Sequence, residues 1–288
     1  MTLDYLLTLM TFCGIYSILA LSLNILIGYA GQVSLGHAAF FGIGAYASAI
    51  FTVKLGLSYW ISLPLSILIT AFFGFLLGLP SLRVKHDFLV LATIGMNFVV
   101  VSLFNYISFF GGPYGIVGIP RPSLFGHTLM TMGYFLYTLF WVILVILFVR
   151  YLTKKYVRYG FEAIKEDEWA AESIGVSVPR FKIYAFTIAG ALAGLAGNLW
   201  AHQMGAIFPD NFSFPVSISI LTMVVLGGIG TIIGPIVGAV LLTILPEVLR
   251  FVQDYRMFIY GVIVVLLMLY QPSGLLGKKG ILRRLVTR

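Results

Sequence analysis

The chain alternates between long apolar runs and short polar or glycine-rich breaks. Several runs exceed the roughly 18 residues typical of a membrane-spanning helix, and they contain few charged residues. The pattern predicts nine helical spans. They cover residues 3–27, 38–53, 59–79, 88–108, 129–149 and 183–200, two short spans within 216–249, and residues 257–270. We therefore predict an all-α, polytopic helical membrane protein with a single domain over residues 1–288.

One segment departs from this pattern, because residues 160–177 are strongly charged and rich in helix formers. They hold five of the ten acidic residues. Four apolar residues are spaced to share one flank, which predicts a single short amphipathic helix between Gly160 and Gly175. These are Phe161, Ile164, Ala171 and Ile174. Each charge would cost about 2.5 to 3.5 kcal/mol at a bilayer centre, so this helix must lie outside the membrane. It is either a solvated helix in an ordinary loop or a docking element for a soluble partner.

Composition agrees with the pattern, since 60% of the residues are hydrophobic and 10% are charged. The net charge of +8 does not point to nucleic acid, because the basic residues lie in loops and a tail that meet the lipid bilayer. The single cysteine, Cys13, excludes a disulfide framework. Residues 1–4 lack the basic region of a signal peptide, so we expect the first span to be retained.

The basic residues also predict an orientation. If the nine spans alternate in direction, fourteen of the eighteen Lys and Arg residues fall on one side. Most of these lie within residues 150–182 and in the tail after Gln271. Basic loops stay in the cytoplasm, so we predict an external N-terminus, a cytoplasmic C-terminus and a cytoplasmic loop over residues 151–182.

Two glycine-rich segments, residues 28–37 and 227–235, interrupt the apolar runs. Broken backbone persists in hydrocarbon only against protein or a water-filled cavity. The first break is therefore either a tight turn between two helices or a segment that lines a transport pathway, as broken helices do in transporters. The candidate pathway residues are Gly31, Gln32, Ser34, His37, Gly228 and Gly230.

Motifs of enzymes and nucleotide-binding proteins are missing from the sequence. It contains no HExxH or GxSxG, and GLLGKKG at residues 274–280 lacks the spacing of a phosphate loop. Asp4, Glu247 and Asp254 lie near span ends, whereas ion-coupled carriers place ionisable residues mid-membrane. We therefore expect neither an enzyme nor a metal site, and we expect any energy source to be a partner protein.

Three stretches resemble the membrane permease subunits of branched-chain amino-acid ABC transporters. They are GYAGQVSLGHAAFFGIGAYASA at 28–49, FEAIKEDEWAAESIGVSVPRFKIYAFTIAGALAGLAG at 161–197 and LGGIGTIIGPIVGAVLLTILPEVLR at 226–250. The AIKEDE form at 163–168 is similar to the M-type member of the permease pair rather than to its H-type sister. Permeases for urea and short amides look similar, so these substrates stay open, as does a stand-alone secondary carrier.

The resemblance implies that the charged helix is a coupling helix that seats in an ATPase subunit. Its coupling residues would be Glu162, Ala163, Glu166, Asp167, Ala170, Ala171 and Gly175. The implied partners are two ATP-binding cassette subunits, a sister H-type permease and an extracytoplasmic substrate-binding protein. ATP and Mg would bind to the ATPase subunits, and this chain would hold no cofactor. The implied function is import of branched-chain, neutral aliphatic amino acids across the cell inner membrane.

Overall fold

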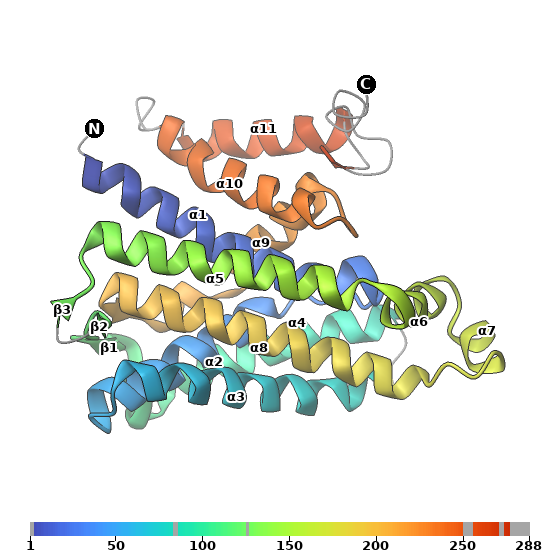
Figure 1. Cartoon of the computed structure of the whole chain (residues 1–288), viewed down its shortest axis with the longest axis horizontal. Helices are drawn as coiled ribbons and strands as arrows, with labels where there is room; N and C mark the ends of the chain where they lie inside the picture. The colour runs from blue at the N-terminus through green and yellow to red at the C-terminus, as the bar shows by residue number, and fades with distance from the viewer. Residues whose placement is uncertain (1–2, 83–85, 125–126, 250–255, 271–273, 277–288) are drawn as a thin grey trace.

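Helices dominate the computed structural model, which describes residues 3–82, 86–124, 127–249, 256–270 and 274–276 (Figure 1). The helices at the predicted spans are α1 (Leu3–Asn24), α2 (His37–Ala49), α3 (Tyr59–Gly78), α4 (His86–Tyr106), α5 (Thr131–Leu152), α8 (Val178–Met204), α9 (Phe214–Gly227), α10 (Ile233–Val248) and α11 (Arg256–Tyr270). Two shorter helices, α6 (Lys155–Glu166) and α7 (Glu168–Ser173), lie between α5 and α8. The short strands β1 (Ile116–Val117), β2 (Ser123–Leu124), β3 (His127–Thr128) and β4 (Ala206–Ile207) form two antiparallel pairs, β1 with β4 and β2 with β3.

The predicted polytopic helical architecture is confirmed, because a helix lies at each predicted span. Six helical segments of the described chain are long and apolar enough to cross a membrane. They are Leu3–Tyr29, Tyr59–Leu82, Phe88–Tyr106, Thr131–Leu152, Val178–Met204 and Pro209–Gly227. Helices α2, α10 and α11 have 13, 16 and 15 residues, so the count of nine crossings stays a prediction.

The long helices run side by side, and their connections gather at two opposite ends (Figure 1). Helices α6 and α7 lie at one end, whereas β1, β2 and β3 lie at the other end together with the start of α1. Helices α1 and α5 therefore run in the same direction, and α8 returns in the opposite direction. The start of the chain and the charged segment thus lie at opposite ends of the bundle, and the end that faces the cytoplasm stays a prediction.

Helix α8 is the centre of the packing, and its most extensive contacts are with α2 and α3. These helices approach closely because glycine lacks a side chain at the points of contact. A Cβ atom on Gly44 of α2 would lie 2.6 Å from the carbonyl oxygen of Gly194, and one on Gly197 would lie 2.7 Å from the backbone nitrogen of Ala45. Small residues spaced four apart are how helices in a bilayer come into close contact.

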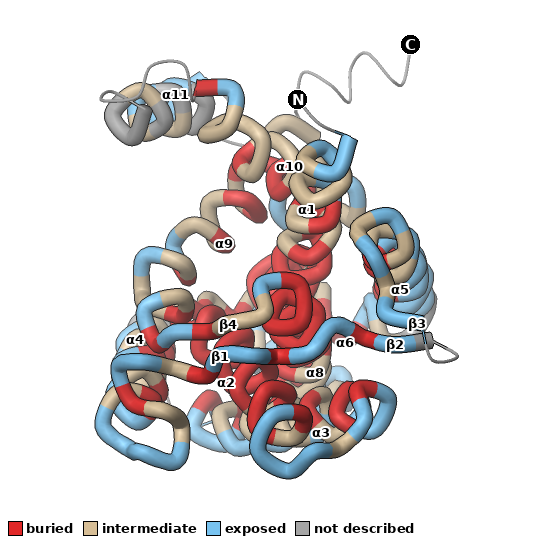
Figure 2. Tube along the Cα trace, turned by 90° about the vertical axis from the view of Figure 1, so that its left-hand side faces the viewer, coloured by how far each residue is buried: buried red, intermediate tan, exposed pale blue. Residues whose placement is uncertain are grey.

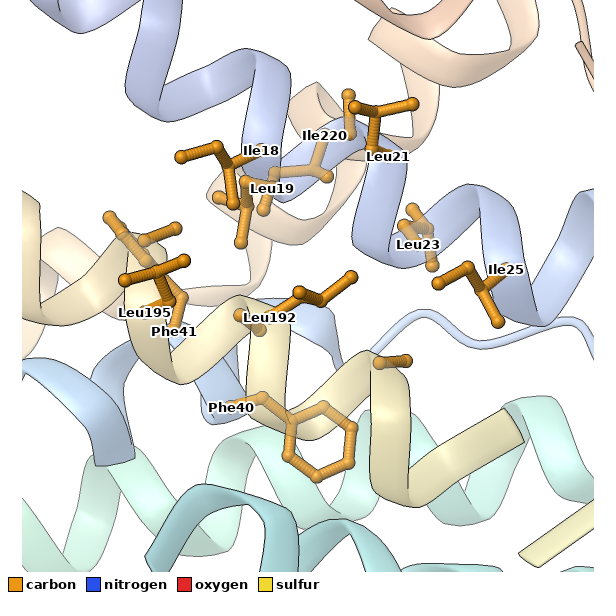
Figure 3. Close-up of a cluster of buried hydrophobic side chains, with 14 of the residues drawn as sticks. Ile18, Leu19, Leu21, Leu23, Ile25, Phe40, Phe41, Leu192, Leu195 and Ile220 are labelled. Atoms are coloured by element: carbon orange, nitrogen blue, oxygen red, sulfur yellow. The ribbon is translucent and has the colours of Figure 1, made fainter. Parts of the chain in front are cut away.

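The apolar core surrounds this contact. Ile18 of α1, Phe41 of α2, Leu192 and Leu195 of α8 and Ile220 of α9 belong to one buried cluster (Figure 3). Buried positions concentrate on α1, α2 and α8, whereas α3, α4 and α5 carry many exposed positions (Figure 2). Those exposed positions include large apolar side chains, which is the pattern expected of helices that face lipid or another membrane subunit.

Candidate functional site

Helices α6 and α7 form a charged element that protrudes from one end of the bundle (Figure 1). The predicted single helix over residues 160–175 was wrong, because the backbone at Asp167 is extended, with φ −159° and ψ 119°. The Asp167 carboxylate accepts hydrogen bonds from the backbone nitrogens of Trp169 (2.8 Å) and Ala170 (3.0 Å). An N-cap aspartate satisfies N–H groups that a helix start leaves unpaired, so this residue begins α7. Gly175, at φ +85°, follows the end of α7, as predicted.

Most of the predicted coupling residues are accessible on this α6–α7 element. Glu166, Asp167, Ala170 and Gly175 are exposed, and Glu162 and Ala163 are half-buried. The Glu162 carboxylate lies 2.8 Å from the Arg158 guanidinium, and this hydrogen bond raises the pKa of Arg158 above its usual value. Ala171 differs from the others, because it is only 2% exposed and packs into the core of its own chain. Its side chain is therefore not available to a docked partner in this structure.

Sequence reasoning missed the exposed apolar side chains of the α6–α7 element. Trp169 is 83% exposed and Ile174 is 75% exposed. The predicted packed flank holds for Phe161 and Ile164, which are buried, but it was wrong for Ile174. The reason is the break at Asp167, which gives α7 a different orientation from α6. Two large apolar side chains exposed on one small charged element suit a protein-binding surface.

The α6–α7 element is fixed to α8 by an ion pair and by aromatic packing. The ammonium group of Lys182 lies 2.6 Å and 2.7 Å from the two carboxylate oxygens of Glu168. Lys182 is 5% exposed, so its charge needs this partner. Phe161 of α6 meets Phe181 of α8 edge to face, with ring centroids 5.4 Å apart. The α6–α7 element is therefore held against the helical bundle by side-chain contacts as well as by the chain itself.

The two predicted glycine-rich breaks lie against each other, and Asn24 joins them. Asn24 is fully buried at the end of α1, where its Nδ2 donates to the carbonyl oxygen of Thr231 (2.8 Å). Its Oδ1 accepts from the backbone nitrogen of Gly230 (2.9 Å). A Cβ atom on Gly28 would lie only 2.7 Å from that same nitrogen. We call this contact of residues 24–31 with residues 228–231 the break junction; it satisfies backbone groups that no helix pairs.

Lys165, in the last turn of α6, connects the α6–α7 element to the break junction. Its ammonium group donates a hydrogen bond to the carbonyl oxygen of Gly28 at 2.8 Å. A Cβ atom on Gly31 would lie 3.0 Å from Cγ of Lys165, and φ of Gly31 is +68°, so the position requires glycine. Lys165 and Asn24 were not among the predicted site residues. The only sequence signal for Asn24 is a lone amide inside an apolar run.

The other pathway candidates fall into two groups. Gly228 and Gly230, at φ +127° and +75°, shape the second break and lie at the junction. Gln32, Ser34 and His37 are buried inside the bundle instead. Nε2 of His37 forms a hydrogen bond with the hydroxyl of Ser22, which donates to the carbonyl oxygen of Ala189 at 3.0 Å. His37 thus ties the start of α2 to α1 and α8.

A second buried polar cluster, which sequence reasoning missed, lies towards the C-terminal end of α8. Nδ2 of Asn198 donates to the hydroxyls of Ser48 (2.7 Å) and Ser66 (3.2 Å). The Ser48 hydroxyl is also bonded to Nε2 of His202 (2.8 Å), and Nδ1 of His202 donates to the carbonyl oxygen of Pro120 (2.6 Å). Polar side chains in a bilayer pair across helices in this way. The cluster joins α2, α3 and α8 to the loop before β2.

The described part of the chain contains no group of three or more His, Cys, Asp or Glu residues placed to hold a metal ion. What it does contain is a protruding charged element, a junction of two broken helices and a single lysine between them.

Comparison of the sequence with known proteins identifies the family of this chain. A family model described as the permease component of the branched-chain amino acid transport system matches residues 5–268. The chain belongs to this family. The permease is therefore a multi-pass membrane transport subunit, and the resemblance seen in its sequence is confirmed.

Individual relatives support the same conclusion. The permease is 38% identical to the high-affinity branched-chain amino acid transport system permease protein LivM of Salmonella typhimurium and to that of Escherichia coli, over 92% of its own length and 68% of theirs. It is 25% identical to a probable LivM of Methanocaldococcus jannaschii, over 98% and 96%. It is also 25% identical to the permease protein LivH of Escherichia coli, over 91% of each chain. No solved structure matches the chain.

Proposed function

We propose that the permease forms part of the membrane path of an ATP-driven importer of branched-chain amino acids. The observation that carries this proposal is the α6–α7 element, which offers the exposed Trp169 and Ile174 to a soluble partner. The same element contacts the break junction through Lys165. A soluble ATPase that binds this element can therefore change the position of the break junction without entering the membrane.

The proposed assembly contains three kinds of partner besides lipid. Two ATP-binding cassette subunits bind ATP and Mg, and one of them docks on the α6–α7 element. A sister permease of the H type completes the membrane path, which agrees with the permease's lower similarity to LivH than to LivM. An extracytoplasmic binding protein delivers the substrate at the opposite end, where β1, β2 and β3 lie (Figure 1).

The proposal places the α6–α7 element in the cytoplasm and the N-terminus outside. Single cysteines at Ser177 and Ser123, each in a Cys13→Ser background, test this orientation, because the two positions lie at opposite ends of the bundle. We expect a membrane-impermeant thiol reagent to label position 123 in intact cells and to reach position 177 only after the membrane is opened. Labelling of position 177 from outside would reverse the proposed orientation.

The scarcity of buried charged side chains in the bundle favours a neutral substrate. Lys182 is the only buried Lys, Arg, Asp or Glu in the described part of the chain, and Glu168 already neutralises it. Burying an unpaired ion costs several kcal/mol, so a solute with net charge would find no partner along these helices. A zwitterionic aliphatic amino acid has no net charge, so it does not need such a partner. Urea and short amides are neutral as well and form the second candidate class.

Reconstitution of the permease with its ATPase subunits, sister permease and binding protein tests the substrate. We expect ATP-dependent uptake of leucine, isoleucine or valine, and competition among these three amino acids. Lysine, aspartate, urea and acetamide should compete at least about tenfold less well. Each either carries a net charge or lacks the aliphatic side chain, and either difference lowers the binding free energy by more than about 1.4 kcal/mol. Uptake confined to urea, an amide or a charged solute would contradict the proposal.

A further inference from the structure

We propose that Lys165 is the positioning residue that transmits movement of the α6–α7 element to the break junction, and that transport loses its coupling to ATP hydrolysis without it. This inference rests on the proposed function, because it assumes that an ATPase moves the α6–α7 element. It assigns the transmission to one hydrogen bond, from the Lys165 ammonium to the Gly28 carbonyl oxygen.

The Gly28 carbonyl is a favourable acceptor for a cation. Gly28 lies in the π-helical turn Ile25–Tyr29, which continues α1 to its end, and the last carbonyls of a helix have no partner within the helix. These carbonyls also carry the negative end of the helix dipole. A hydrogen bond from an ammonium group is shorter and stronger than one between neutral groups. The end of α1 is thus held by a charge on α6.

Close packing around Lys165 and Gly28 involves both glycine-rich breaks. On one side, the stem of Lys165 covers Gly31, where a Cβ atom would lie 3.0 Å from Cγ of the lysine. On the other side, Gly28 packs against the backbone nitrogen of Gly230, which Asn24 also binds. A displacement of α6 therefore cannot leave the first break unchanged, and the first break cannot shift without disturbing the second.

The α6–α7 element also has a second attachment to the bundle. Glu168 holds α7 to α8 through buried Lys182, on the far side of the extended residue Asp167 from Lys165. The α6–α7 element is consequently attached to α8 at Phe161 and Glu168, and to the break junction at Lys165. Any rotation of the element relative to α8 changes the position of Lys165 against Gly28.

The test compares three variants in the complete reconstituted transporter. Lys165→Met keeps an unbranched apolar stem over Gly31 but removes the donor and the charge, whereas Lys165→Arg keeps both. Lys154→Met is the matched control, because Lys154 is an exposed lysine in the same segment of the chain. For each variant, leucine uptake and ATP hydrolysis are measured on the same liposomes and expressed as leucine transported per ATP.

We expect Lys165→Met to lower leucine transported per ATP about tenfold, within the roughly 5- to 150-fold range of coupling between distant sites. Its ATP hydrolysis should stay within about twofold of wild type, and Lys165→Arg and Lys154→Met should keep the wild-type ratio. An unchanged ratio in Lys165→Met would overturn the inference. A proportionate loss of uptake and hydrolysis would also overturn it, because that result indicates defective assembly. Failure of wild type itself to use ATP would refute the proposed function instead.

Discussion

Replacing Gly28 with alanine should lower leucine uptake by the reconstituted permease at least about tenfold, although the protein should still reach the membrane. The added Cβ would lie 2.7 Å from the Gly230 nitrogen and would also collide with the Asn24 side chain. Forcing an extra carbon into a packed site typically costs about 1–3 kcal/mol. Here the strain would separate the two breaks or break the Asn24 hydrogen bonds, so the junction could not adopt its present geometry.

Gly95→Ala is the matched control for this substitution. Gly95 lies in α4, and a Cβ atom there would meet nothing within 4 Å beyond the adjoining residues and backbone of its own helix. Both variants are compared by their amount in the membrane, their melting temperature in detergent and their leucine uptake. Normal uptake by Gly28→Ala would show that the close contact of the breaks is not needed for transport.

Truncating Trp169 to alanine should weaken binding of the ATPase subunits about 30-fold, with little change in the stability of the permease alone. The indole is 83% exposed, so the fold gains little from it. Tryptophan is prominent among the few interface residues whose truncation costs about 2 kcal/mol or more, because its large apolar surface is buried against the partner. Such a loss corresponds to the expected 30-fold weakening, at about 1.4 kcal/mol for each tenfold change.

Tyr114→Ala controls for the loss of a large exposed aromatic side chain. Tyr114 is 86% exposed and precedes β1, at the end of the bundle opposite the α6–α7 element (Figure 1). Titration of the purified pair of permease and sister permease with the ATPase subunits gives the dissociation constant for each variant. If both substitutions weaken ATPase binding equally, or if Trp169→Ala does not weaken it, then Trp169 is not part of the docking surface.

The helices and the two breaks could be predicted from the sequence because each depends on local composition. A run of apolar residues as long as a bilayer is thick identifies a span wherever its neighbours lie. Clusters of glycine such as those at residues 28–36 and 227–234 interrupt helices for equally local reasons. These properties need no knowledge of tertiary contacts.

The contacts that build the site could not be predicted, because their partners are distant in sequence. Lys165 and Gly28 are 137 residues apart, and Asn24 and Gly230 are 206 apart. The bend at Asp167 was missed for a different reason. An aspartate inside a charged helix and an aspartate that caps a new helix look alike in sequence, and only the position of the backbone separates them.

The proposed function is ATP-driven transport of leucine through this permease, powered by separate subunits. Its most direct test is accumulation of labelled leucine in liposomes that hold the complete transporter and have no ion gradient. We predict accumulation that requires ATP on the side of the α6–α7 element and that is unaffected by a protonophore or a sodium ionophore. Leucine uptake that persists without ATP and follows a proton or sodium gradient would contradict this account.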